Sequence, residues 1–91
     1  MLKIRFSTVF KKDYKRLKKR RYDMTALDDT IRMIAECQEL PKSYRDHALI
    51  NDYSGCRECH IASDWLLVYE IRQSELILYL TRTGTHSDIF P

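Results

Sequence analysis

The sequence has few of the residues that usually mark turns and flexible linkers, with only two glycines and two prolines among its 91 residues. This scarcity indicates a compact globular chain and not a disordered one. The length predicts one domain over residues 1–91, and its hydrophobic periodicity indicates an α+β fold. No apolar run is long enough to span a membrane, and the first residues lack the hydrophobic region of a signal peptide. Three cysteines, an odd number, supply no complete disulfide framework. We therefore expect a cytoplasmic protein with reduced thiols.

Positive charge is concentrated in one short stretch. The net charge is only +3, but residues 11–21 hold eight of the sixteen Lys and Arg side chains against a single acid, Asp13. That stretch therefore carries +7 and the rest of the chain −4. Its five lysines are Lys11, Lys12, Lys15, Lys18 and Lys19. So many like charges at helical spacing predict a polyanionic partner; a solvated helix face is the alternative.

The hydrophobic periodicity predicts the element order β-α-α-β-β-β. Alternation over residues 2–6 indicates a first strand, and two apolar stripes indicate helices that end near Arg21 and Glu39. A loop is expected over residues 40–54. Three more strands are expected at 56–62, 65–72 and 75–82, followed by a tail with room for one helical turn. The first strand should pair in parallel with a later one, and both helices should cover one sheet face, which leaves the other open.

The segment Cys56-x-x-Cys59-His60 matches the c-type haem attachment pattern. Such attachment requires export, for which the sequence shows no signal. A zinc ribbon would need a second ligand pair, and Cys37 alone does not supply one. Because residues 56 and 59 of a strand point to opposite faces, we expect two small, partly buried thiols.

All three histidines lie in the C-terminal half of the chain: His47 in the loop, His60 on a strand and His86 in the tail. With Asp64 at a hairpin turn and Arg82 at the end of the last strand, they form a candidate acid–base site. The set suits RNA cleavage without a metal or cofactor, because RNA supplies its own 2′-OH nucleophile. His and Asp can then exchange protons while Arg binds the phosphate. A three-histidine zinc site is the less favoured alternative.

Four segments together resemble the YafQ-type toxins, which belong to the RelE superfamily of bacterial type II toxin–antitoxin systems. They are Tyr44-Arg45-Asp46-His47-Ala48-Leu49, Arg57-Glu58-Cys59-His60-Ile61, Asp64-Trp65-Leu66-Leu67-Val68-Tyr69 and Arg82-Thr83-Gly84-Thr85-His86-Ser87-Asp88-Ile89-Phe90. The similarity covers nearly the whole chain and includes the basic first helix. It implies a small microbial-RNase-like sheet with two helices packed on one face. Asn51 stands where a Gly is common in the family, and Asn also tolerates a left-handed turn.

The resemblance also implies an activity and partners. These toxins are metal-independent endoribonucleases that cut mRNA in the ribosomal A site and thereby inhibit translation. Each has a cognate antitoxin, usually of the ribbon-helix-helix type, and meets operator DNA only through the antitoxin complex. Carried over residue by residue, the family's catalytic positions fall on His47, His60, Asp64, Arg82 and His86. Its substrate-binding aromatic positions fall on Trp65 and Phe90.

Two other functions fit parts of the sequence. A ParE-like toxin that poisons DNA gyrase belongs to the same superfamily, but that subgroup lacks the constellation of His and Asp side chains. A non-enzymatic module would bind nucleic acid through the basic helix over residues 11–21 alone, with the histidines as ordinary surface residues.

Overall fold

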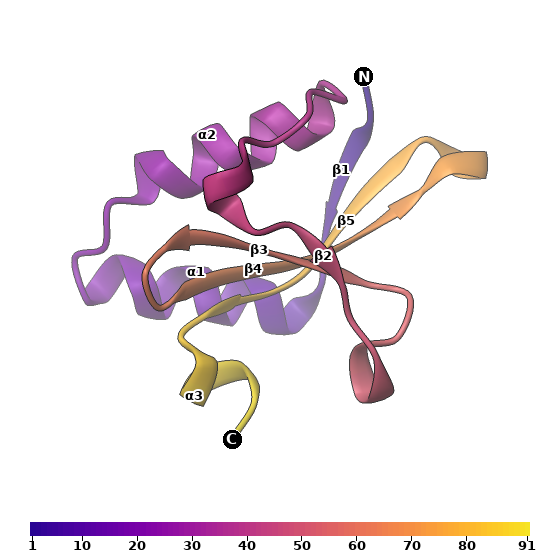
Figure 1. Ribbon diagram of the computed structural model, residues 1–91. Coiled ribbons are helices and arrows are strands. Elements are labelled where there is room, and N and C mark those ends of the chain that lie inside the picture. The colour runs from indigo at the N-terminus through magenta and orange to yellow at the C-terminus, as the bar shows by residue number, and fades with distance from the viewer.

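One five-stranded mixed sheet forms the centre of the computed structural model, which describes residues 1–91. Its strands are β1 (Lys3–Phe6), β2 (His47–Ala48), β3 (Arg57–Ala62), β4 (Trp65–Arg72) and β5 (Ile77–Gly84). Their spatial order is β1-β5-β4-β3-β2, with β1 parallel to β5 and the other pairs antiparallel. The predicted parallel pairing of the first strand and the meander of β3, β4 and β5 are therefore confirmed (Figure 1).

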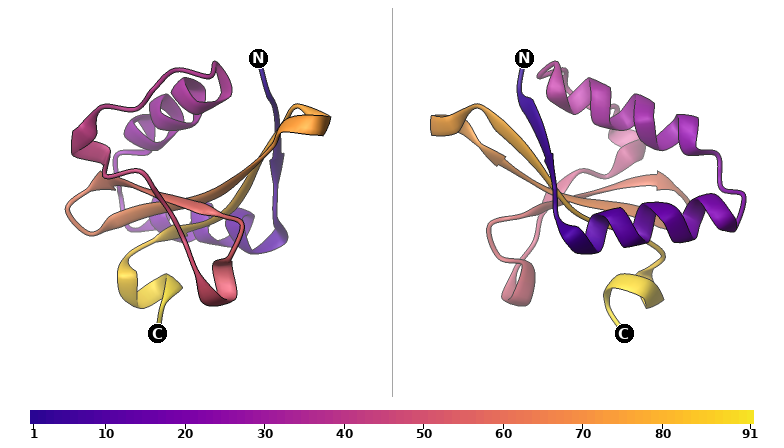
Figure 2. Two further views of the ribbon diagram at one scale, coloured as in Figure 1. Left: turned by 45° about the vertical axis from the view of Figure 1, so that its right-hand side comes forward. Right: turned by 180° about the vertical axis from the view of Figure 1, so that it is seen from behind.

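Two helices, α1 (Thr8–Lys19) and α2 (Met24–Ala35), cover one face of the sheet, as the view from behind shows (Figure 2). Ser7 caps α1 by accepting a hydrogen bond from the Phe10 N–H at 2.9 Å, and Asp23 caps α2. The apolar stripes of both helices face the sheet. The core there includes Phe10, Leu17, Leu27, Ile34, Leu67, Leu78 and Leu80. Full burial of one such side chain contributes roughly 1.5–3 kcal/mol to stability.

Both helices end earlier than predicted, and for the same reason. Arg21 and Cys37 adopt the left-handed conformation, with φ of 61° and 60°. The residues that follow them, Tyr22 and Gln38, each donate a backbone N–H to the carbonyl five positions earlier in the chain. This hydrogen bond completes a Schellman motif at each helix end. Glycine usually occupies this left-handed position, and its absence here explains why the sequence predicted longer helices.

Two features of the sheet also differ from the prediction. The loop expected over residues 40–54 contains β2, which has too few residues to show an alternating pattern. The last strand begins only at Ile77, because a 3₁₀ turn over Gln73–Glu75 ends at Leu76 in the left-handed conformation, and it continues to Gly84. Arg82 therefore lies inside β5 and not at its end.

The sheet face opposite α1 and α2 is not fully open as expected. A one-turn helix, α3 (His86–Ile89), folds back against it and places Ile89 over Leu66 and Val68. Cys56 packs against this second cluster, whereas Cys59 is buried in the main core, so the two thiols do point to opposite faces. Burial raises the pKa of the Cys59 thiol to about 12. None of the helices has the length and apolar character that crossing a bilayer requires.

Candidate active site

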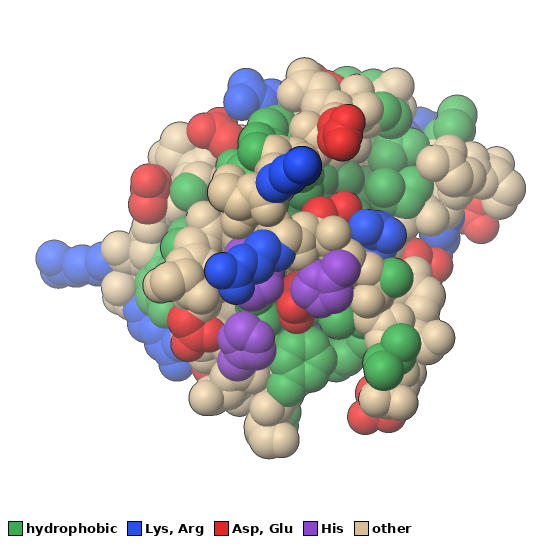
Figure 3. Space-filling model, in the orientation of Figure 1, with side chains coloured by type: hydrophobic (Ala, Val, Ile, Leu, Met, Phe, Trp, Pro, Cys, Tyr) green, Lys and Arg blue, Asp and Glu red, His purple; other side chains and the backbone are tan.

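The three histidines lie together on the sheet face that α1 and α2 leave uncovered (Figure 3). His47 comes from β2, His60 from β3 and His86 from the first position of α3. The ring centroids of His47 and His60 are 6.4 Å apart, and those of His60 and His86 are 6.1 Å apart. Segments separated by up to 39 positions thus converge, as the sequence predicted.

A buried carboxylate, Glu58, supports two of these rings and was missed in the sequence analysis. Its Oε2 lies 3.3 Å from His47 Nε2 and 3.7 Å from His60 Nε2, while only 6% of its side chain is exposed. The spacing of Glu58 and His60 on one strand already placed both on the same face. That periodicity was the signal that could have identified Glu58.

The environment of His60 favours its neutral form. Burial is the largest cause that lowers its pKa, and the charges of Arg45, His86 and His47 lower it further. Glu58 opposes the shift by attracting the imidazolium. Because the ordinary histidine pKa is about 6.5, His60 is mostly neutral at pH 7 and can accept a proton there.

Asp64 contacts His86 of α3. Its Oδ1 accepts the backbone N–H of His86 at 3.0 Å and lies 2.9 Å from His86 Nδ1. These contacts, the backbone bond first, lower the pKa of the Asp64 carboxyl. A carboxylate at Nδ1 orients the ring and leaves Nε2 to face a substrate.

The two aromatic side chains expected to bind substrate have different surroundings. Phe90 is 41% exposed, and its ring centroid lies 6.3 Å from that of His86 and 5.6 Å from that of Tyr53. Trp65 is buried in the core on the helix side, where its indole N–H donates to Thr83 Oγ1 at 3.0 Å. The structure thus places Phe90 beside the histidines and Trp65 beneath the sheet.

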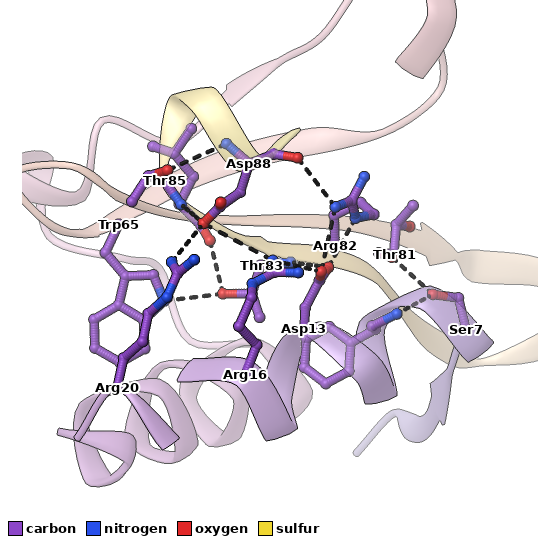
Figure 4. A network of polar contacts seen from close by, with 12 residues as sticks. Ser7, Asp13, Arg16, Arg20, Trp65, Thr81, Arg82, Thr83, Thr85 and Asp88 are labelled. Carbon is purple, nitrogen blue, oxygen red and sulfur yellow. Dashed lines mark hydrogen bonds and ion pairs between the residues drawn. The ribbon is translucent and has the colours of Figure 1, made fainter. Parts of the chain in front are cut away.

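Arg82 is held by an acid from the basic helix. Its Nε donates to Asp13 Oδ2 at 2.7 Å, and its Nη2 donates to Asp13 Oδ1 and to the Asp88 carbonyl, each at 3.2 Å (Figure 4). Its Nη1 lies 3.5 Å from the Tyr53 hydroxyl. The hydrogen bond to Asp13 is the largest cause that raises the Arg82 pKa, so the guanidinium is charged throughout the accessible pH range.

The C-terminal part of β5 lacks a neighbouring strand on the side of β1, and this explains why the basic helix contains an aspartate. β1 pairs with β5 only as far as Leu80. Beyond that point, Ser7 Oγ donates to the Thr81 carbonyl at 2.7 Å, and Asp13 Oδ2 accepts the Thr83 N–H at 3.1 Å. These side chains satisfy backbone groups that a neighbouring strand would otherwise pair.

The five lysines of α1 have exposed side chains and lie around the faces that do not contact the sheet. None of them takes part in an ion pair. By contrast, Arg16 and Arg20 face Asp88 of α3, at 3.8 Å and 3.2 Å. The lysines of the basic helix thus make no ion pair within the chain, whereas two of its arginines contact the C-terminal segment.

Solved structures of known proteins share the fold of this chain. The metal-bound toxin from Helicobacter pylori has a TM-score of 0.93 and 41% identity, over 99% of this chain and 100% of that chain. YafQ in the Escherichia coli DinJ–YafQ complex has a TM-score of 0.88 and 35% identity, over 100% of both chains. The sheet, the two covering helices and this resemblance define a small bacterial toxin of the RelE-like fold.

The family follows from the sequence comparison. Residues 2–91 match the model described as bacterial toxin of type II toxin–antitoxin system, YafQ. The chain is also 36% identical over 88 residues to the mRNA interferase toxin YafQ of Escherichia coli (strain B / BL21-DE3), which is 96% of this chain and 94% of that protein. This chain belongs to the YafQ family of type II toxins, as its sequence motifs indicated.

The metal-bound relative raises the question of whether these side chains suit a metal. No three His, Cys, Asp or Glu side chains are arranged here to hold one ion. The ring centroids of neighbouring histidines on this face are more than 6 Å apart, and Glu58 lies between His47 and His60. As placed, the donors do not converge on a common point, so no chemical step is assigned to a metal.

Proposed function

We propose that this toxin is a ribosome-dependent mRNA endoribonuclease that cuts in the A site and inhibits translation. The observation that carries the proposal is the grouping of a neutral histidine, His60, with a histidine oriented by a carboxylate, His86, on one exposed face. The mRNA interferase activity of the Escherichia coli relative supports it. A gyrase poison has no need of such a pair.

The reaction divides between the two histidines. His60 accepts the proton of the RNA 2′-OH, whose oxygen attacks the adjacent phosphorus. His86 donates a proton from Nε2 to the leaving 5′ oxygen, while Asp64 holds the ring at Nδ1. Arg82 stabilises the negative charge that develops on the non-bridging phosphate oxygens, and His47 shares the Glu58 carboxylate with His60. Phe90, partly exposed beside His86, stacks on a base.

The exposed lysines of α1 supply affinity rather than chemistry. Each lysine that neutralises an RNA phosphate releases a counterion, so binding to the ribosome should weaken as salt rises. Replacing Lys11, Lys12, Lys15, Lys18 and Lys19 with Gln should weaken binding and flatten that salt dependence. The face of α1 that carries them is separate from the histidines, so cleavage by bound toxin should continue.

The proposed partners follow the relatives. The Escherichia coli YafQ forms a complex with DinJ, and we infer a cognate antitoxin here, of the ribbon-helix-helix type. Operator DNA is then contacted only through that complex. Because ribosomes and mRNA are the targets, the toxin acts in the cytoplasm.

The products of cleavage test the mechanism. Toxin stripped with EDTA and then desalted should cut mRNA on intact programmed ribosomes as fast as untreated toxin. The ends should be a 2′,3′-cyclic or 3′-phosphate and a 5′-hydroxyl, and an mRNA with a 2′-deoxynucleotide at the cut position should resist. A 5′-phosphate product, or activity restored only by added metal, would contradict the mechanism because it indicates a metal-activated water.

A further inference from the structure

Arg82 does not present a free guanidinium to a substrate. An arginine has five N–H donors, and Asp13 and the Asp88 carbonyl occupy the donors on Nε and Nη2. Only Nη1 remains available, and it points to the Tyr53 hydroxyl. Tyr53 packs on Phe90, which adjoins His86, so the available edge of Arg82 faces the proposed substrate side.

The charge around Arg82 remains positive despite its acidic partner. Asp13 also accepts a hydrogen bond from Arg16 at 2.8 Å, and Asp88 pairs with Arg20 at 3.2 Å. Three arginines thus share two carboxylates in one connected network (Figure 4). Because Asp13 is only 1% exposed, its carboxylate is screened little by water and holds the guanidinium firmly.

We propose that Asp13 is the positioning residue of Arg82: it fixes the guanidinium so that Nη1 alone meets the phosphate at the site of cleavage. The inference rests on the proposed nuclease function. Under this proposal α1 has two separate roles. Its lysines bind RNA, and Asp13 aligns the guanidinium of Arg82, which binds the phosphate. A shift of about 1 Å in such a group can lower a rate about 10²-fold.

A purely structural role for Asp13 is the competing explanation, because Asp13 also caps the edge of β5 at Thr83. Ser7 provides the matched control. It bonds the same edge two residues earlier, at Thr81, and makes no contact with Arg82. Ser7→Ala therefore weakens the same junction of α1 and β5 without touching the guanidinium.

The experiment compares Asp13→Asn, Ser7→Ala, Arg82→Lys and the double variant Asp13→Asn/Arg82→Lys in single-turnover cleavage of ribosome-bound mRNA. Urea unfolding establishes that each variant is folded under the assay conditions. We expect Asp13→Asn to lower the cleavage rate constant by about 10- to 100-fold, with the half-saturating toxin concentration changed less than about twofold. Ser7→Ala should keep its rate within about twofold of wild type even if it loses as much stability.

The double variant separates the two explanations. If Asp13 acts through Arg82, the double variant should cut no more slowly than Arg82→Lys alone. Losses that multiply, or equal losses in Asp13→Asn and Ser7→Ala, would overturn the inference and leave the nuclease proposal standing. A wild-type toxin that does not cut would overturn the nuclease proposal itself. If Asp13→Asn does not fold, Asp13→Glu replaces it, since the charge stays and the longer side chain displaces the guanidinium.

Discussion

Two aspartates of this toxin each hold a cationic or ionisable partner at nearly the same distance, but in different surroundings. Asp64 Oδ1 lies 2.9 Å from His86 Nδ1, and more than half of each side chain is exposed. Asp13 Oδ2 lies 2.7 Å from Arg82 Nε, with 1% and 19% of the side chains exposed. Distance alone would rank the two contacts as equals.

Burial separates them. Water and salt screen the Asp64–His86 contact, so it adds little to stability and the ring can adjust to a substrate. Asp13 accepts four hydrogen bonds in a buried junction between α1 and β5, where a charged partner left unpaired would lower the stability strongly. Under the proposed mechanism, the group that transfers a proton is therefore adjustable and the charge that binds phosphate is fixed.

The largest effect should come from the exposed pair, and on activity alone. His86→Ala removes the proposed general acid, and proton transfer typically contributes about 10²–10⁴-fold to a rate. We expect single-turnover cleavage of ribosome-bound mRNA to fall by that factor, with the urea midpoint and antitoxin binding unchanged. His47→Ala should lose less, because the proposed mechanism gives His47 no proton to transfer and only a shared contact with Glu58.

An unaltered rate in His86→Ala, together with inactive Asp64→Ala and His60→Ala, would show that the acid is another residue. Rates near wild type in all four variants would remove the active-site proposal. The non-enzymatic alternative also predicts ribosome binding that depends on the lysines, but it predicts no cleavage by the wild-type toxin or by any variant.

The second effect concerns stability and should separate the two aspartates. Asp13→Ala leaves Arg82 without its carboxylate and the Thr83 N–H without an acceptor, and breaking a buried charged pair costs about 3–5 kcal/mol. Asp64→Ala removes only an exposed contact, so its urea midpoint should stay at the wild-type value. Equal losses of unfolding free energy in the two variants would contradict the role given to burial.

The fold was predictable where periodicity over many residues determines it. Alternation and helical stripes predicted the two helices, the hairpin of β3 and β4 and the parallel first strand, all of which the structure confirms. The helix ends were not predictable, because Arg21 and Cys37 take a conformation usually marked by glycine. Asn51, with φ of 61°, is the one such position that its residue type indicated.

The sequence indicated residues for the candidate site but not their contacts, and it missed Glu58. The resemblance pointed to the histidines, Asp64, Trp65, Arg82 and Phe90; the structure brings the histidines together and buries Trp65 in the core. It could not show that Asp64 would face His86, because that contact depends on how α3 folds back. The role of Asp13 could not be predicted for a similar reason. It is one acid in a basic stretch, and its burial follows from the end of β1, beyond which Asp13 pairs with the backbone of β5.

The smallest effect tests the balance of charge around His60. The proposed mechanism requires neutral His60, so the rate should rise with pH through the His60 pKa, and this limb should lie below pH 6.5 because burial lowers that pKa. Glu58→Gln removes a charge that favours the imidazolium, so the limb should move to lower pH. Arg45→Gln removes a charge that opposes it, so the limb should move to higher pH.

The two substitutions control for each other, because each replaces a charged side chain near the same ring by the same neutral amide. At pH 7 the rates should differ from wild type by less than about twofold, since most of His60 is already neutral there. The measurement is therefore the single-turnover rate between pH 5 and pH 7 for all three proteins, with ribosomes shown to stay intact. Opposite displacements identify His60 as the proton acceptor. Displacement in the same direction, or a limb that neither substitution moves, would assign the base to another group and leave His60 as a support for His47 and Glu58.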